Sequence, residues 1–266
     1  MVSRGNLHPE NMTLTLRSVP NIPMIQPGDI LVDILFNSLQ AEGIALEDGD
    51  ILVVAQKIVS KAEGRLFNLT QVEPSPRAVE LAQATEKDPR FVELVLRESN
   101  EVLRTRAGTL IVEHRAGFVC ANAGIDHSNV QGPWGSAEDW VLLLPEDADA
   151  SAERLRAGLH ERTGANLGVV IIDSHGRAWR NGTVGVTIGL SNVPGIVDMR
   201  GQEDLFGYTL RVTMVAAADE LAAAASLMMG QAAECTPMVH VRGFPYALRA
   251  AQLQELIRPK AMDLFR

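Results

Sequence analysis

Runs of apolar and polar residues predict strands and helices in turn along this 266-residue chain. Continuous apolar runs at 51–54 and 167–172 predict strands that are buried on both faces. Further strands are predicted at 13–19, 140–144, 208–215 and 238–241, with a hairpin over 110–119. Helices are predicted at 29–40, from 76 to before 88, and at 91–98, 148–163, 219–229 and 246–257. This mixture predicts an α/β fold with mixed α+β sheets.

Two of these helices have a clear start signal. Asp29 is predicted to cap the helix that follows it, and Ser75 precedes a proline at a first helical position. Residues 12–258 are predicted to form one domain after a flexible tail, 1–11. If that domain has two lobes, we expect the boundary near 133–135.

Composition and charge exclude several classes of protein but do not identify the function. The net charge of -9 and the pI near 5.2 argue against general binding to nucleic acid or anionic membranes. The N-terminus lacks the apolar region of a signal peptide, and the apolar stretch 214–229 contains two acidic residues, which indicates a packed helix. Two cysteines are too few for a disulfide framework, so a reducing, cytoplasmic setting is expected.

The most informative segment is the cationic run 55–65, which directly follows the apolar run 51–54. Lys57, Lys61 and Arg65 bring positive charge to the end of a buried strand, and Gly64 lets a ligand approach closely. No G-x-x-x-x-G-K-[ST] motif occurs in the chain. The run therefore predicts a phosphate site outside the P-loop class, while an exposed strand-end lysine is the plainer interpretation of Lys61.

Two carboxylates are candidates for holding a metal ion. Asp126 and Asp173 each follow an apolar, strand-like segment and are expected at turns. Carboxylates at strand ends commonly present Mg²⁺ or Mn²⁺ to a nucleotide, and Ser174 offers a hydroxyl beside Asp173. Asn129 can donate to a base or a phosphate oxygen. Taken singly, each aspartate is more often a turn former.

Other residues of possible chemistry are more easily explained by structure. Gly182, Gly185 and Gly189 fit neither glycine-rich nucleotide motif and are predicted to mark bulges or close packing in a strand. His127 and His175 are expected to be solvated loop residues rather than ligands. Cys120 and Cys235 are predicted to be small buried residues. No histidine pair has the spacing of a zinc site.

Five blocks of sequence together resemble the coenzyme F420:L-glutamate ligase family. They lie in the family's order, within residues 14–243, and the combination is specific to it. The blocks are 21–24 with 27–29, 48–65, 121–129, 173–180, and 204–207 through 229–234.

The resemblance implies a GTP-dependent ligase of coenzyme F420 biosynthesis, in its stand-alone form. Such an enzyme phosphorylates the terminal carboxylate of the deazaflavin precursor F420-0, and the amino group of L-glutamate then displaces the phosphate through an amide bond. The resemblance also implies two divalent cations, Mg²⁺ or Mn²⁺, a monovalent cation such as K⁺, and an unusual two-lobed fold that pairs as an intertwined homodimer.

Roles transfer residue by residue onto this sequence. Lys61 becomes the catalytic, phosphate-contacting lysine, and the metals fall on Asp126 with Asp173 and on Ser174 with Gln231. Arg177 and Arg180 are left open between the substrate phosphodiester and the incoming glutamate. The nucleotide contacts fall on Asn21, Ile22, Pro23, Met24, Gln56, Lys57, Lys61, Asn129, Met229, Gly230, Gln231, Ala232, Ala233, Glu234, Cys235 and Thr236.

A few positions depart from the family pattern. Asn21 and Cys235 each replace a usual glycine, and Ser174 replaces a usual threonine while keeping the hydroxyl. These departures leave room for a paralogous amide-forming ligase that acts on another acid. A non-catalytic nucleotide-binding relative is disfavoured, because Lys61 and both aspartates are present.

Overall fold

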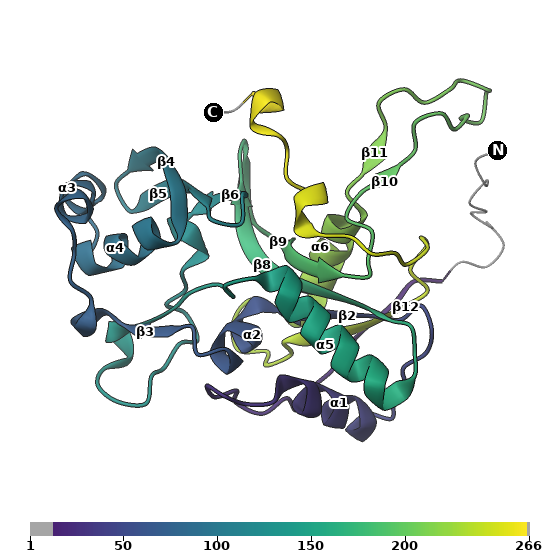
Figure 1. Ribbon diagram of the computed structural model, residues 1–266, viewed down its shortest axis with the longest axis horizontal. Helices are drawn as coiled ribbons and strands as arrows, with labels where there is room; N and C mark the ends of the chain where they lie inside the picture. Colours follow the sequence, from purple (N-terminus) through teal and green to yellow (C-terminus); the bar gives the residue numbers. More distant parts are fainter. Residues whose placement is uncertain (1–12, 265–266) are drawn as a thin grey trace.

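A five-stranded sheet with the order β1-β12-β2-β8-β9 forms the centre of the computed structural model, which describes residues 13–264 (Figure 1). The strands β2 (Ile51–Ala55) and β8 (Gly168–Arg177) pair in parallel, and their neighbours pair antiparallel. The two apolar runs predicted as buried strands are therefore adjacent at the middle of the sheet. The other strands of this sheet are β1 (Thr15–Ser18), β9 (Arg180–Ser191) and β12 (Met238–Arg242).

Helices cover both faces of the sheet, and the side-chain alternation of β2 assigns its residues to two separate cores. Leu52 and Val54 pack in one cluster with α1 (Leu31–Ala41), α2 (Gln56–Ala62) and α5 (Ala148–Thr163). Ile51 and Val53 pack on the other side with α6 (Ala217–Met229). Burial on both faces explains why these strands are continuously apolar.

A second group of elements lies at one end of this sheet (Figure 1). It contains the three-stranded sheet β4-β5-β6 and a two-stranded pair of β3 and β7, and it has its own hydrophobic cluster. The bounds are β3 (Leu66–Asn68), α3 (Pro76–Thr85), α4 (Pro89–Arg97), β4 (Ser99–Arg106), β5 (Thr109–His114), β6 (Val119–Ala121) and β7 (Trp140–Leu142).

Glycines in β9 allow two helices to pack directly on the sheet. A Cβ atom on Gly185 would lie 2.6 Å from the Ala222 carbonyl oxygen in α6, and one on Gly189 would lie 2.4 Å from the Ala148 carbonyl carbon in α5. No side chain fits at such distances. The prediction of close packing in a strand is confirmed for these two glycines.

Several predicted elements are correct. The helix over 148–163 has the predicted bounds, and Ser75 caps α3 by accepting a hydrogen bond from Ala78 N. α4 begins two residues before its predicted start, capped by Asp88, which accepts from Arg90 N and was not predicted as a cap. The hairpin over 110–119 is formed by β5 and β6. Within residues 13–264, no helix is long and apolar enough to cross a bilayer. The predicted tail 1–11 lies outside the described residues.

Other predictions are wrong. Helix α1 begins at Leu31, and the Asp29 carboxylate instead accepts a hydrogen bond from Gln26 N at 2.8 Å. No helix forms over 246–257 beyond the short 3₁₀ turn η4 (Leu253–Glu255), because that segment lies along the protein and Leu253 N donates to Asp149 Oδ2 at 2.9 Å. β4 was not predicted, and the strand at 208–215 shrinks to β11 (Met214–Val215), which pairs with β10 (Val197–Asp198).

Candidate active site

The cationic run after β2 folds into the short helix α2 rather than extending as a strand end. Lys57 and Lys61 lie four residues apart and therefore project from the same side of the helix. Lys61 Nζ donates to the Asn129 carbonyl at 2.9 Å, and Lys57 Nζ donates to the Ser128 carbonyl at 3.0 Å. Both ammonium groups therefore meet the segment that follows Asp126. Burial, and then the charge of Lys57, lower the pKa of Lys61.

Asp126 is held at this place by both its backbone and its side chain. Its backbone exchanges two hydrogen bonds with Leu142 in β7, each of 2.9 Å. Its Oδ2 atom accepts a 2.7 Å hydrogen bond from Gln56 Nε2 and lies 3.2 Å from Lys57 Nζ. Burial, and then the negative charge of Asp173, raise the pKa of the Asp126 carboxyl. The two aspartates predicted as metal ligands are therefore close enough to repel each other.

Asp173 lies within a strand and not at the turn that the sequence predicts. β8 continues to Arg177, and Asp173 pairs with Val186 of β9. His175 lies on the same face of β8, with Nε2 3.0 Å from Asp173 Oδ2 at an angle that does not form a hydrogen bond. Its side chain is only 11 % exposed, so the prediction of a solvated loop residue is wrong for His175. His127 does lie in an exposed loop, stacked on Phe91.

Ser174 faces the opposite side of β8, towards the segment that follows α6. Its Oγ atom donates to Gln231 Oε1 at 2.9 Å, and Gln231 Nε2 donates to Ser226 Oγ at 3.0 Å. Asn129 Nδ2 donates to the Ala232 carbonyl at 3.0 Å, which links this segment to the loop that carries Asp126. Ser174 and Gln231, to which the resemblance assigns the second metal, are therefore in direct contact, and their role as metal ligands stays a prediction. Ser226, in the last turn of α6, was not predicted.

The remaining predicted nucleotide residues lie in two loops. One loop meets the end of α2, and the other follows α6. The loop of Asn21, Pro23 and Met24 meets the end of α2, where Gly28 N donates to the Ala62 carbonyl at 2.9 Å, and Ile22 packs against the same core as α2. In the second loop Thr236 Oγ1 donates to the Met229 carbonyl at 2.9 Å, and Glu234 Oε2 accepts from Ala232 N. Met24 is 74 % exposed and Cys235 is exposed too, so the prediction of burial is correct for Cys120 and wrong for Cys235. The other residues of this second loop are Gly230 and Ala233.

The donor set of the site suits a hard divalent cation. Asp126 and Asp173 supply carboxylate oxygens, and Ser174 and Gln231 supply a hydroxyl and an amide oxygen, which are ligands that Mg²⁺ and Mn²⁺ accept. Among residues 13–264 no three His, Cys, Asp or Glu side chains form a complete metal site by themselves. A cation here needs further oxygens from phosphate or water, which is the usual arrangement for Mg²⁺ at a nucleotide.

The part of the chain that matches known proteins includes these residues. The model of the family F420-0:gamma-glutamyl ligase matches residues 20–243, a range that contains every residue of the site described above. The chain belongs to this family. It is 45 % identical over 257 residues to coenzyme F420:L-glutamate ligase of Methanothermobacter thermautotrophicus, covering 96 % of this chain and 100 % of the relative. It is 46 % identical over 258 residues to the ligase of that name from Methanopyrus kandleri (96 % and 98 %), and 40 % identical over 250 residues to that from Methanosarcina mazei (94 % of each).

Two residues of the nucleotide loops predicted from the resemblance have an unusual backbone conformation. Asn21 and Cys235, at positions where the resemblance leads us to expect glycine, adopt positive φ angles of 62° and 55°. Glycine occupies this region without strain, and asparagine tolerates it better than most residues do. The substitution at 21 is therefore mild, whereas that at 235 places a strained cysteine in the loop after α6.

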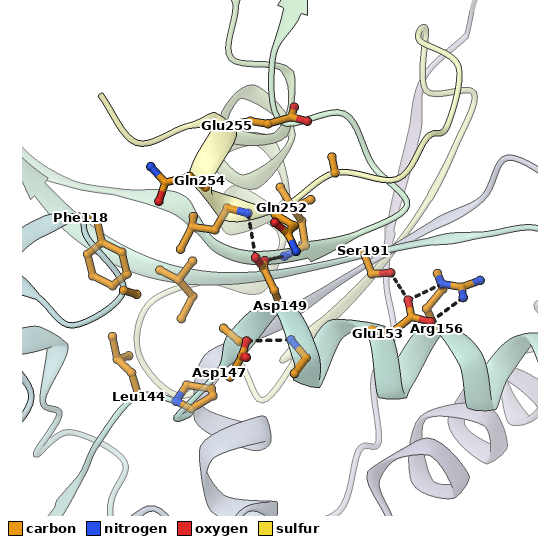
Figure 2. Close-up of a pocket in the computed structure, with 18 of the residues that line it drawn as sticks. Phe118, Leu144, Asp147, Asp149, Glu153, Arg156, Ser191, Gln252, Gln254 and Glu255 are labelled. Atoms are coloured by element: carbon orange, nitrogen blue, oxygen red, sulfur yellow. Dashed lines mark hydrogen bonds and ion pairs between the residues drawn. The ribbon is translucent and has the colours of Figure 1, made fainter. Parts of the chain in front are cut away.

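One cavity lies apart from these residues and has a different chemistry. It measures about 1350 Å³ and is lined by α5, the segment 250–255 and the end of β9 (Figure 2). Two of its carboxylates already have partners: Asp149 accepts from Leu190 N and Leu253 N, and Glu153 accepts from Arg156 (Figure 2). An acidic cavity of this kind is a poor site for a phosphate, so the candidate active site remains the one around Asp126 and Asp173.

Proposed function

We propose that this protein transfers the γ-phosphoryl group of GTP to a carboxylate of F420-0 and then joins L-glutamate to it. One observation carries the proposal. In a chain of the F420-0:gamma-glutamyl ligase family, the two lysines of α2 meet the loop of Asp126, and Asp126 lies near Asp173. Cations and a lysine around paired carboxylates are the groups that stabilise a transferring phosphoryl group.

The reaction has two bond exchanges. A carboxylate oxygen of F420-0 attacks the γ-phosphorus, the bond to the β–γ bridging oxygen breaks, and GDP leaves. The glutamate amine then attacks the acyl carbon, the carbon–oxygen bond to phosphate breaks, and the nitrogen loses one proton as the amide forms. Bound divalent cations would neutralise charge on the phosphate oxygens, held by Asp126 with Asp173 and by Ser174 with Gln231.

The chain's own residues position the reacting groups. Lys61, the catalytic lysine of the proposal, is partly desolvated, which strengthens its attraction for a phosphate oxygen. Gln56 and Lys57 hold the Asp126 carboxylate from one side, so its free oxygen is directed away from α2. The loops of 21–24 and 229–236 would enclose the nucleotide.

A homodimer is part of the proposal. The β10–β11 arm extends away from the central sheet and carries strongly exposed apolar side chains, with Leu205 98 %, Phe206 94 % and Val212 86 % exposed (Figure 1). Such side chains favour burial against a second copy. A monovalent cation such as K⁺ is also proposed, and the reaction can be assayed with and without it.

The test is direct. The protein is mixed with GTP, Mn²⁺, L-glutamate and F420-0, and the deazaflavin is followed by mass while GDP is measured separately. The proposal predicts added glutamate residues with matching GDP. GDP release with another acid but no mass gain on F420-0 would instead support a paralogous ligase. An absence of GDP under all conditions would support a non-catalytic relative.

A further inference from the structure

A second cavity lies where the β3–β7 pair meets the loop 127–139. It measures about 450 Å³, within the usual range of small-molecule sites. Trp134 and Trp140 form an aromatic wall, with their ring centroids 5.1 Å apart, and the rest of the lining comes from β3, the turn after it and Arg97 of α4. Aromatic and apolar side chains with a few polar groups are the composition expected of a site for an organic ligand.

Asn68, at the end of β3, brings an unpaired donor to this cavity. Its Oδ1 atom accepts hydrogen bonds from Thr70 N and Thr70 Oγ1, which fixes the orientation of the amide. Its Nδ2 atom is buried and has no hydrogen-bond partner within residues 13–264. A Cβ atom on Gly135 would lie 3.9 Å from Nδ2, so the donor is directed at the segment next to Trp134. A buried donor without a partner is unfavourable, so an acceptor supplied by a ligand would be stabilising here.

The cavity and the candidate active site share one face of the β3–β7 pair. Asn68 pairs with Trp140, and Leu142, two residues further along β7, pairs with Leu66 on one side and with Asp126 on the other. Residues directly opposite each other in antiparallel strands project to the same face, and so do residues two apart in one strand. The backbones of Asn68 and Asp126 are therefore roughly 12 Å apart, two strand spacings across and two residues along.

A single loop joins the two places. After Asp126 the chain first makes its contacts with the two lysines of α2 and then reaches Trp134 in the cavity wall. Gly132 lets this loop lie directly on the ring of Trp140, because a Cβ atom there would be 2.0 Å from the ring carbon Cδ2. Trp140 Nε1 also donates to the Trp134 carbonyl at 2.6 Å. The aromatic wall is therefore held by the same loop that contacts the lysines.

We propose that this cavity binds the planar heterocycle of a substrate, with a ring carbonyl that accepts a hydrogen bond from Asn68 Nδ2. The inference rests on the proposed function, whose substrates include two such rings, the deazaflavin of F420-0 and the guanine of GTP. Each ring is joined to its reacting group through an arm that contains phosphate, which suits a ring site set apart from Asp126. None of the residues to which the resemblance assigns the nucleotide lines the cavity, so the deazaflavin is the expected occupant. Because Gly135 lies beside Nδ2, its segment moves outward as the ring enters.

Equilibrium binding tests this without turnover. The Kd values for F420-0 and for GDP are measured by calorimetry, each with Mn²⁺ and without the other substrate. Asn68→Ser keeps an oxygen that can accept from Thr70 N but removes the amide donor. Its Kd for F420-0 is expected to rise about three- to tenfold, as for the loss of one hydrogen bond. Trp134→Ala, which removes the half-exposed ring of the wall and keeps the carbonyl that Trp140 contacts, is expected to raise the same Kd.

Thr70→Val is the matched control. Thr70 is exposed, and its hydroxyl donates to the same amide through Oδ1. The substitution therefore weakens the same turn but leaves Nδ2 unchanged. Its Kd for F420-0 is expected to stay at the wild-type value, and the Kd for GDP is expected to stay there in all three variants.

The outcomes separate this inference from the proposed function. A rise confined to the Kd for GDP would assign the cavity to guanine instead of the deazaflavin. Unchanged Kd values for both ligands in Asn68→Ser and in Trp134→Ala overturn the inference, and the ligase stands if the wild-type protein glutamylates F420-0. If the wild-type protein binds F420-0 without glutamylating it, the proposed function fails, while the same Kd values still decide on the cavity. If it binds neither F420-0 nor GDP, both fail.

Discussion

Replacing Gly185 by alanine tests whether the packing of α6 on β9 fixes the geometry of the active site. Gly185 pairs with Ser174 across the sheet, and α6 lies directly above it. The added Cβ would lie 2.6 Å from the Ala222 carbonyl oxygen and 2.6 Å from Ser226 Cβ. Because both are parts of one helix, α6 has to move away by roughly 1 Å before the contact becomes ordinary.

This movement is expected to lower the free energy of unfolding and to change the metal dependence of the reaction. Overpacking of this size costs about 1–3 kcal/mol in the free energy of unfolding. Ser226 accepts a hydrogen bond from Gln231, and Gln231 accepts one from Ser174. A shift of α6 therefore displaces Gln231 from Ser174. We expect the Mn²⁺ concentration for half-maximal turnover to rise several-fold in Gly185→Ala, while the KM for L-glutamate stays unchanged.

Gly176→Ala is the matched control in the same hairpin. Gly176 lies on β8, and a Cβ atom there has no heavy atom within 4 Å. Its free energy of unfolding is expected to stay within about 0.5 kcal/mol of the wild-type value. Urea denaturation of both variants, read as midpoint and slope, supplies the comparison. The reasoning is refuted if Gly185→Ala is as stable as Gly176→Ala and has the same Mn²⁺ dependence as the wild type.

Three further outcomes are expected. Cys235→Gly removes the strain of a φ of 55° and should raise the free energy of unfolding by about 0.5–1 kcal/mol relative to Cys235→Ala, measured by thermal unfolding. Asp126→Ala should abolish turnover with an unchanged circular dichroism spectrum; substantial residual activity would contradict its role in holding a metal ion. Burial lowers the pKa of His114 from 6.5 to about 4, so the folded state binds fewer protons than the unfolded one between these values. Stability should therefore fall by up to about 3 kcal/mol as the pH falls from 6.5 to 4, and His114→Gln should flatten that slope in urea titrations.

Local signals predicted much of the secondary structure, and the failures have physical causes. The helix over 148–163 is amphipathic and ends at Gly164, so its own sequence determines it. The segment 246–257 has helical spacing but is held along the cavity by a hydrogen bond to Asp149, a contact from more than a hundred residues earlier. The order of the central sheet depends on such long-range pairing as well. β12, the last strand in sequence, lies between β1 and β2.

The residues of the candidate site could be predicted from the sequence, but their positions relative to one another could not. The resemblance to the ligase family identified Ser174 and Gln231, whose side chains meet although 57 positions separate them. It gave no sign that β8 continues through Asp173. The alternation of Asp173, His175 and Arg177 was visible in the sequence, but it has meaning only once these residues are known to form a strand. His175 was therefore misassigned to a loop.

The glycines of β9 affect the site indirectly, because they help to fix the position of the neighbouring strand β8, which carries Asp173 and Ser174. Alternate residues of β8 serve different sides of the site, so a slip of its register by one residue would exchange the faces of Asp173 and Ser174. That register is tied to the close contacts of β9, where Gly189 lies against the backbone of α5 and Gly185 against that of α6. Neither helix can approach so closely at any other residue type. These glycines resemble a phosphate-binding loop in sequence, yet what they do is fix where the sheet and the two helices meet, and with it the faces to which Asp173 and Ser174 point.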